Sequence, residues 1–183
     1  MAILRGLVAA LGRINSTLNV VLRQLGWLCV AAMVAIILTQ VVFRYVLNSP
    51  LNWTEEAARF LMLWLIAFMA PSAYRWGGFV SIDMLADALP PRLREILVLL
   101  LTSVATLVLV VLVSHAIDHF NAGTIFKSAA LKIPLKWVYL SLGVCFGLML
   151  LVNIELWLRS LGRLLGIEAG FEPPQMPADI QAE

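Results

Sequence analysis

The sequence is organised around four long runs without charged residues. Three of them cover residues 24–43, 96–117 and 137–154. Because an α-helix rises about 1.5 Å per residue, each of these runs reaches or nearly reaches across the roughly 30 Å of hydrocarbon in a bilayer. This pattern predicts three membrane-spanning helices.

The remaining run is shorter and needs additional length. It covers residues 60–74, which would reach only about 22 Å as a helix. Beginning the helix at Trp53 supplies the missing turns, since Asn52 or Thr54 can cap it. The two glutamates at 55–56 then occupy the first turn, where carboxylates favour the positive end of the helix dipole. We therefore predict a fourth spanning helix here.

The runs are apolar on every helical face, and this decides between the possible architectures. A β-barrel strand would alternate apolar and polar residues over about ten positions, and the strands of soluble folds are shorter than these runs. We predict an all-α integral membrane protein with a four-helix transmembrane domain over residues 23–160. Its spans are expected at about 25–46, 53–74, 93–117 and 134–157.

Two further segments are expected to lie along the membrane surface. Residues 1–22 can form an interfacial amphipathic helix. Its apolar residues share one face and its polar residues lie off that face: Ile3, Leu7, Leu11, Ile14 and Leu18 against Arg5, Arg13 and Asn15. Residues 80–89 carry Asp83 and Asp87 among apolar residues and predict a short in-plane segment between the second and third spans. Residues 161–183, rich in proline beyond Glu168, predict a flexible tail.

Lysine and arginine are distributed unevenly between the two sides of this topology. Eight fall on the side of the termini and five on the other side. Since cytoplasmic loops carry the excess of basic residues, the bias predicts both termini in the cytoplasm. The eight are Arg5, Arg13, Arg23, Arg75, Arg92, Arg94, Arg159 and Arg163, and the five are Arg44, Arg59, Lys127, Lys132 and Lys136.

The composition agrees with this pattern and excludes a soluble domain. Of the 183 residues, 62% are hydrophobic and only 13% are charged, whereas soluble domains carry about 25% charged residues. The basic amino terminus precedes an apolar run that is too long for a signal peptide, and no small-residue cleavage site follows, so we expect a retained first span. Cys29 and Cys145 fall inside spans, where we expect small apolar side chains and no disulfide.

Charges at the ends of the apolar helices are the first candidates for a function, because charge near the hydrocarbon is costly. Arg44 precedes the turn at residues 48–51, and Glu55, Glu56 and Arg59 follow it. Two antiparallel helices would bring Arg44 close to the two carboxylates at one membrane face. We interpret the group as an ion-pair cluster that fixes the first hairpin, and contact with a partner is the alternative.

A second polar group ends the third span. His115, Asp118 and His119 are spaced to share one helix face, as metal ligands can. No cysteine or further histidine completes a site, so we favour interfacial solvation and expect no bound metal. Because both histidines lie on one helix, they cannot ligate a haem from two sides.

Small and aromatic residues indicate packing and anchoring. Gly143 and Gly147 form a GxxxG pattern that lets helix backbones approach closely, and the neighbour is either another helix of this chain or a separate subunit. No phosphate-binding glycine loop, activated nucleophile or basic patch suited to nucleic acid is found. The aromatic residues near span ends, as in an interfacial belt, are Trp53, Trp76, Trp137, Tyr139 and Trp157.

The spans offer little for a transport path. A carrier usually needs broken helices or inverted repeats around a midplane site, and these spans are mostly uninterrupted and apolar. They favour an accessory or scaffolding subunit. A small homo-oligomeric channel would need a polar pore-lining face, and a membrane redox enzyme would need cofactor ligands on two helices.

Several of these residues stand in motifs that resemble a known family. Residues 42–48 (VFRYVLN) and 53–60 (WTEEAARF) are similar to the signature of the small membrane subunit of tripartite ATP-independent periplasmic (TRAP) transporters, the DctQ-like family. The resemblance continues through 73–75, 80–85 and 133–140 and covers roughly residues 25 to 160. It departs from the family pattern at 76–79 and at Gly143.

The resemblance implies an accessory subunit in the inner membrane of a bacterium, with no catalysis and no cofactor of its own. Such a subunit pairs with a large membrane subunit, which carries substrate and sodium, and with a periplasmic substrate-binding protein. It would brace the large subunit and help dock the binding protein during uptake of an organic acid, such as a dicarboxylate or a sialic acid. Membrane lipids are the other expected partner. The candidate structural or partner-interaction residues are Arg44, Tyr45, Trp53, Glu55, Glu56, Arg59, Asp83, Gly143 and Gly147.

Overall fold

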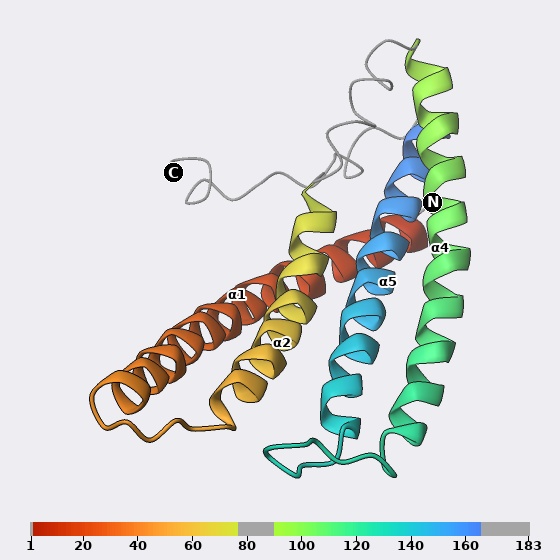
Figure 1. Cartoon of the computed structure of the whole chain (residues 1–183). Helices are drawn as coiled ribbons and strands as arrows, with labels where there is room; N and C mark the ends of the chain where they lie inside the picture. Colours follow the sequence, from red (N-terminus) through yellow and green to blue (C-terminus); the bar gives the residue numbers. More distant parts are fainter. Residues whose placement is uncertain (1, 77–89, 166–183) are drawn as a thin grey trace. The chain divides into compact units, whose positions relative to one another are not determined.

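The computed structural model describes residues 2–76 and 90–165, and these form four α-helices. The helices are α1 (Ala2–Tyr45), α2 (Thr54–Arg75), α4 (Pro91–Ala122) and α5 (Lys136–Leu164) (Figure 1). Each contains a stretch long and apolar enough to cross a membrane. Within the described ranges, the only β-type pairing is an isolated bridge between Lys127 and Pro134. The predicted all-α membrane architecture is confirmed.

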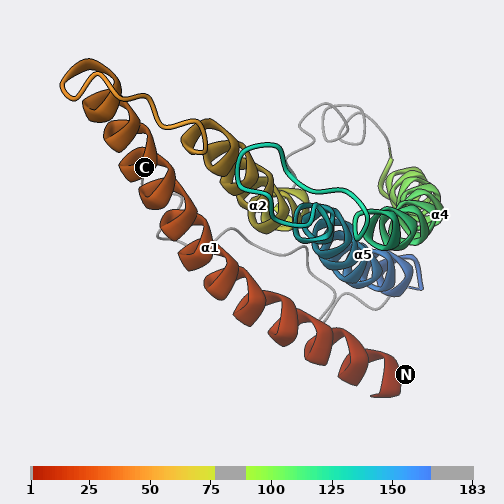
Figure 2. The same cartoon turned by 60° about the horizontal axis from the view of Figure 1, so that its bottom comes forward.

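α1 is one helix of 44 residues, and Figure 2 shows it as a continuous ribbon. The sequence predicted an interfacial helix over residues 1–22 followed by a span from about residue 25. The structure has no break between these segments, because no proline or turn interrupts α1 near Arg23. The location of the first turns at the membrane surface stays a prediction.

α2 begins at Thr54, one residue after the predicted start. The Thr54 side chain is fully buried, and its hydroxyl donates a hydrogen bond to the carbonyl oxygen of Leu51 at 2.9 Å. The connection from α1 turns sharply at Asn48, whose φ of 53° lies in the left-handed region that asparagine tolerates well. Local sequence preferences therefore account for where this helix begins.

α4 and α5 both continue beyond the predicted membrane spans, to Ala122 and Leu164. Charged residues mark where a chain leaves the hydrocarbon, but a helix ends only where a capping or breaking residue stops it. For α4 this residue is Gly123, where an added Cβ would lie 2.9 Å from the backbone N and Cα of Lys136. The close approach of the loop to the start of α5 therefore requires glycine.

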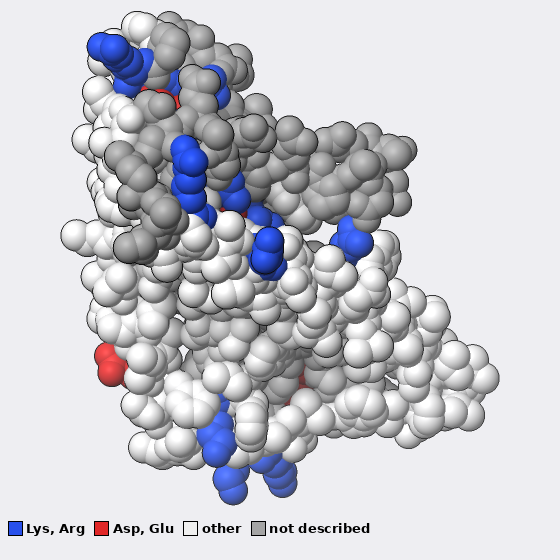
Figure 3. Space-filling view, turned by 180° about the vertical axis from the view of Figure 1, so that it is seen from behind, with Lys and Arg blue, Asp and Glu red and all other residues white. Residues whose placement is uncertain are grey.

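The surface of these helices is apolar, while several of their buried side chains are polar. Leu107 and Leu38 are 67% and 60% exposed, whereas Asn153 and Glu155 are fully buried. Figure 3 shows lysine and arginine in small patches on a surface made mostly of uncharged residues. Helices surrounded by hydrocarbon need this arrangement, because polar side chains in a bilayer turn towards other helices.

The helices divide into two compact units. Unit 1 comprises the described residues of Met1–Asn19, Pro71–Val111 and Leu148–Glu183, and unit 2 comprises Val20–Ala70 and Leu112–Gly147. Each helix contributes one segment to each unit. The predicted in-plane segment with Asp83 and Asp87, and the tail beyond residue 165, lie outside the described residues.

Candidate functional site

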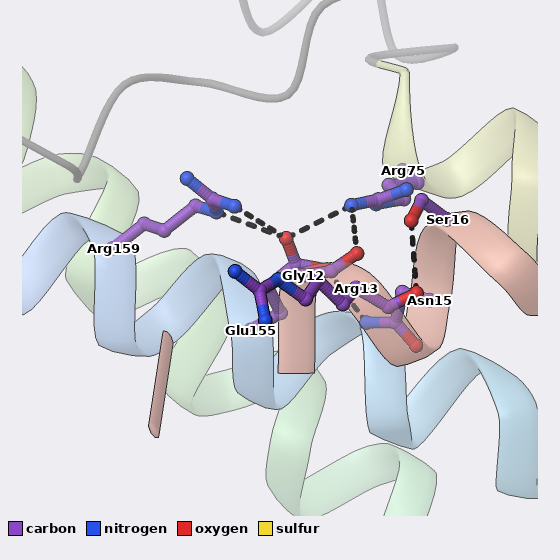
Figure 4. A network of polar contacts seen from close by, with 7 residues as sticks. All are labelled: Gly12, Arg13, Asn15, Ser16, Arg75, Glu155 and Arg159. Carbon is purple, nitrogen blue, oxygen red and sulfur yellow. Dashed lines mark hydrogen bonds and ion pairs between the residues drawn. The ribbon is translucent and has the colours of Figure 1, made fainter. Parts of the chain in front are cut away.

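The carboxylate of Glu155, on α5 in unit 1, is fully buried and lies at the centre of a polar network (Figure 4). Its Oε1 accepts hydrogen bonds from Arg75 Nη2 at 3.0 Å and from Arg159 Nε and Nη2 at 3.0 and 2.8 Å. Its Oε2 accepts a hydrogen bond from Asn15 Nδ2 at 2.6 Å. Helices α1, α2 and α5 therefore meet at one carboxylate.

Glycine at one position of α1 makes room for this arrangement. Arg75 Nη2 also donates a hydrogen bond to the carbonyl oxygen of Gly12 at 3.2 Å. A Cβ atom at position 12 would lie 3.0 Å from Arg159 Nη2 and 3.4 Å from Glu155 Oε1. Any larger side chain would press on the ion pair. We refer to Gly12, Asn15, Arg75, Glu155 and Arg159 as the Glu155 network.

A second buried polar contact lies two residues earlier on α5. Asn153 Nδ2 donates hydrogen bonds to the carbonyl oxygen of Thr102 at 3.0 Å and to Thr106 Oγ1 at 2.7 Å. Its Oδ1 accepts a hydrogen bond from the hydroxyl of Tyr74. Asn153 thereby joins α5 to both α4 and α2.

Two further groups of polar contacts join helices within unit 1. Ser72 Oγ donates a hydrogen bond to Asn19 Oδ1 at 2.5 Å, between α2 and α1. Glu95 Oε2 pairs with Arg163 Nε at 3.0 Å and accepts a hydrogen bond from Ser160 Oγ at 3.2 Å, between α4 and α5. All four helices are therefore tied together by polar side chains within this unit.

The chemistry of the Glu155 network suits a structural role. An isolated buried carboxylate would cost several kcal/mol in lost solvation. Here Arg75 and Arg159 compensate its charge, and Asn15 occupies its second oxygen. With both oxygens engaged by donors, the carboxylate is poorly placed to accept a proton or to bind a substrate. The network instead fixes the positions of three helices.

The sequence interpretation missed this network. It took Glu155 as the end of the fourth span and Asn15 as part of the polar side of a surface helix. A signal was present, because Asn15 and Asn19 are four residues apart and Asn153 lies within an apolar helix, and such residues usually face other helices. On the face predicted to be apolar, Leu7 and Ile14 are 52% and 51% exposed, whereas Asn15 on the predicted polar side is buried.

The predicted ion-pair cluster of the first hairpin is wrong in its pairing. Glu55 Oε1 accepts a hydrogen bond from Gln40 Nε2 at 3.1 Å. The guanidinium of Arg44 lies over the ring of Tyr45, 5.8 Å from its centroid. Among the residues that the structure describes, no ion pair joins Arg44 or Arg59 to a glutamate. Gln40, one turn before Arg44, contacts α2 instead, while the Arg44 side chain packs on Tyr45 of its own helix.

Glu56 anchors a loop and makes no ion pair with Arg44. Its Oε2 accepts hydrogen bonds from the backbone N–H groups of Ala130 and Leu131, at 2.9 and 3.0 Å. The loop between α4 and α5 is therefore fastened to the first turn of α2, within unit 2. Two consecutive N–H groups form an anion-binding turn only in a particular backbone conformation, so the sequence alone did not reveal this contact.

His115, Asp118 and His119 do not converge on one point. His119 Nδ1 lies 2.8 Å from the carbonyl oxygen of His115, and its ring packs edge-on against Tyr139. The Nδ1 of His115 and the Oδ2 of Asp118 are 4.0 Å apart, and both side chains are largely exposed. In the described part of the chain, no three His, Cys, Asp or Glu side chains are grouped to hold a metal ion.

The remaining candidates differ in their surroundings. A Cβ atom at Gly143 would lie 3.9 Å from Ala116 Cβ on α4, which is an ordinary contact. At Gly147 an added Cβ would meet nothing within 4 Å. Tyr45 is 75% exposed and Trp53 is 39% exposed. Gly147, Tyr45 and Trp53 therefore leave surface available to a neighbour.

Comparison with known families gives a match over most of the chain. Residues 33–163 match the family described as tripartite ATP-independent periplasmic transporters, DctQ component. The matched region contains Arg75, Asn153, Glu155 and Arg159. It begins within α1, after Gly12 and Asn15.

Individual relatives agree with this match. The chain is 27% identical over 139 residues to the sialic acid TRAP transporter small permease protein SiaQ of Vibrio cholerae, which covers 76% of this chain and 80% of that protein. It is 30% identical over 144 residues to the isethionate TRAP transporter permease protein DctMQ of Oleidesulfovibrio alaskensis, covering 68% of this chain and 23% of that protein. For the sialic acid TRAP transporter permease protein SiaT of Haemophilus influenzae, the identity is 27% over 131 residues, covering 72% of this chain and 21% of that protein.

Proposed function

Because the chain belongs to the DctQ family of TRAP transporters, we propose that it is the small membrane subunit of such a transporter and supports a large membrane subunit. The two longer relatives support this pairing. The chain matches only 23% and 21% of their lengths, which leaves most of each protein for a larger membrane part joined to the DctQ-like part. In this proposal the chain is a separate subunit that corresponds to the DctQ-like part of those longer polypeptides.

The proposed substrate is an organic acid, and its uptake is coupled to sodium. Two relatives are named for sialic acid and one for isethionate, and all three names denote organic acids. Substrate choice and sodium coupling are assigned to the large subunit and to a periplasmic binding protein. The described helices of this chain support that division, because the buried side chains of Glu155 and Asn153 bind other groups of the chain and are not presented to a substrate.

One observation carries the accessory role, namely that the side chains of Glu155 and Asn153, buried in unit 1, bind other groups of the same chain. Glu155 binds two arginines and Asn15, and Asn153 binds three side chains or backbone groups. A transport site must instead present polar groups to a passing substrate near the middle of the membrane. Helices fixed in this way, with apolar outer faces, are suited to bracing a moving partner.

The loop between α4 and α5 is the proposed contact for the binding protein. In the predicted topology it lies on the side opposite the termini, and Glu56 holds it in place. A fixed loop loses little conformational freedom on binding, which favours association. Its exposed side chains include Ile125, Phe126, Lys127 and Lys132.

Reconstitution of transport tests the role. We expect the large subunit and the binding protein to take up the organic acid in proteoliposomes only when this chain is present, and to co-purify with it. Uptake by the chain alone, or equal uptake without it, would refute the proposal. The double variant Lys127→Glu/Lys132→Glu should weaken association of the binding protein while the two membrane subunits still co-purify, since these lysines lie in an exposed loop.

A further inference from the structure

Two buried nitrogen atoms of unit 1 have no hydrogen-bond acceptor among the residues that the structure describes. They are Nε of Arg75, on α2, and Nδ2 of Asn19, on α1. The two residues are only 9% and 7% exposed. A buried donor without an acceptor costs about 1–3 kcal/mol, and in native proteins such a group usually has a partner, which can be ordered water. We propose that one internal water molecule, bound between α1 and α2, accepts a hydrogen bond from each of these nitrogens.

Both donors belong to the contact between α1 and α2. Nη2 of Arg75 donates hydrogen bonds to the carbonyl oxygen of Gly12 at 3.2 Å and to Glu155 Oε1 at 3.0 Å (Figure 4). One turn earlier on α2, Ser72 Oγ donates a hydrogen bond to Asn19 Oδ1 at 2.5 Å. Two atoms bonded to the same carbon are about 2.3 Å apart, so each unpaired nitrogen lies beside an atom that joins the two helices. The proposal places the water molecule along α1 between Gly12 and Asn19, an interval of about 10 Å.

Water suits the chemistry of this position. Both unpaired nitrogens are donors, so the occupant must accept two hydrogen bonds. Ser72 Oγ offers the water a third partner, because a hydroxyl oxygen that donates one hydrogen bond can still accept others. About three hydrogen bonds are typical of a buried water molecule.

Two observations favour water over other ligands. The protein encloses both nitrogen atoms, and this excludes a lipid head group or a peptide. Glu155 already pairs with Arg75, so a neutral molecule suits the position better than an anion does. The contact of α1 with α2 is therefore expected to contain water although the outer surface of the helices is apolar.

Nuclear magnetic resonance tests the proposal on the wild-type chain. The full-length chain is prepared in micelles with isotope-labelled arginine, and magnetisation transfer from water to the Nε–H groups is recorded. We expect a cross-peak between water and the Nε–H of Arg75, with the sign of dipolar transfer rather than of proton exchange. The signal is assigned by its loss in the variant Arg75→Lys. Absence of the dipolar cross-peak in the wild-type chain would overturn the proposal.

The variant Asn19→Leu removes one of the two donors and places apolar atoms beside the other, so it should abolish the cross-peak. The matched control is Asn153→Leu, which makes the same change at a buried asparagine of the same unit whose Nδ2 donates to Thr102 and Thr106. The control should keep the cross-peak. Its survival in Asn19→Leu, or its loss in both variants, would overturn the proposal.

A crystal structure of the wild-type chain that resolves ordered water gives a second test, which does not depend on the folding of any variant. We expect an isolated density peak about 2.7–3.2 Å from both Arg75 Nε and Asn19 Nδ2. No peak at this position, a peak near only one of the nitrogens, or density from an ion or another part of the chain would each overturn the proposal.

Discussion

The variant Glu155→Gln is the sharpest test of the Glu155 network. Glutamine keeps the shape of the side chain but removes its charge, which leaves Arg75, whose side chain is only 8% exposed, beside a neutral amide. Breaking a buried ion pair by removing one partner costs about 3–5 kcal/mol. One amide oxygen still accepts a hydrogen bond, so we expect a loss of about 3 kcal/mol in the free energy of unfolding.

The loss is measured by unfolding the purified chain in mixed micelles with increasing concentrations of a denaturing detergent. Unfolding is monitored by tryptophan fluorescence. Glu95→Gln is the matched control, because it makes the same change in the same unit. The side chains of Glu95 and Arg163 are 20% and 24% exposed, and a pair closer to solvent contributes only about 0–1 kcal/mol. Replacing both members of the most buried pair, as in Arg75→Met/Glu155→Leu, should recover part of the lost stability, because the 8% exposed arginine is removed together with the carboxylate and only the more exposed Arg159 loses its ion pair with Glu155.

The reasoning fails if Glu155→Gln and Glu95→Gln reduce the free energy of unfolding equally. Such a result would mean that solvent reaches the carboxylate of Glu155 and weakens its ion pairs. It would also fail if Arg75→Met/Glu155→Leu were less stable than Glu155→Gln, since the destabilisation could not then come from an uncompensated arginine.

Two further variants test the close contacts. Gly12→Ala should lower the thermal unfolding temperature, because the added Cβ would lie 3.0 Å from the guanidinium of Arg159. The control Gly6→Ala adds a Cβ that meets nothing within 4 Å. It should be neutral, or should stabilise the protein by up to about 1 kcal/mol because alanine has the higher helix propensity. Glu56→Ala should increase hydrogen exchange of the backbone amides at 130–131, because it removes the carboxylate that accepts their hydrogen bonds. The exchange is measured by mass spectrometry. The control Glu55→Ala should leave it unchanged, and equal exchange in both variants would contradict the anchoring role.

The helices were predictable because hydrocarbon thickness sets the length of an apolar run. The start of α2 was predictable for a local reason as well, since residues 52–56 contain both capping groups and acidic residues of the first turn. α4 and α5 continue beyond the predicted spans, because charge marks the edge of the hydrocarbon while a helix continues until a residue such as Gly123 stops it; the span bounds themselves stay predictions.

The contacts between side chains were less accessible to sequence reasoning. Proximity in a hairpin suggested that Arg44 would lie close to Glu55 and Glu56. Helix rotation and side-chain direction decide which residue reaches across, and in this hairpin Gln40 reaches Glu55. The Glu155 network joins residues 140 positions apart in sequence at Asn15 and Glu155. Partners this distant are identified only when the packing of the helices is known.

The location of the polar groups in unit 1 follows from how helices associate in a bilayer. Lipid chains are as apolar as leucine, so apolar packing gives little reason for helices to choose particular neighbours. Hydrogen bonds and ion pairs between buried polar side chains supply that choice, and in this chain Glu155 and Asn153 together contact all of the other three described helices. Because the arrangement of unit 1 does not depend on its outer surface, that surface can remain apolar and accommodate either lipid or a large membrane partner without loss of the fold.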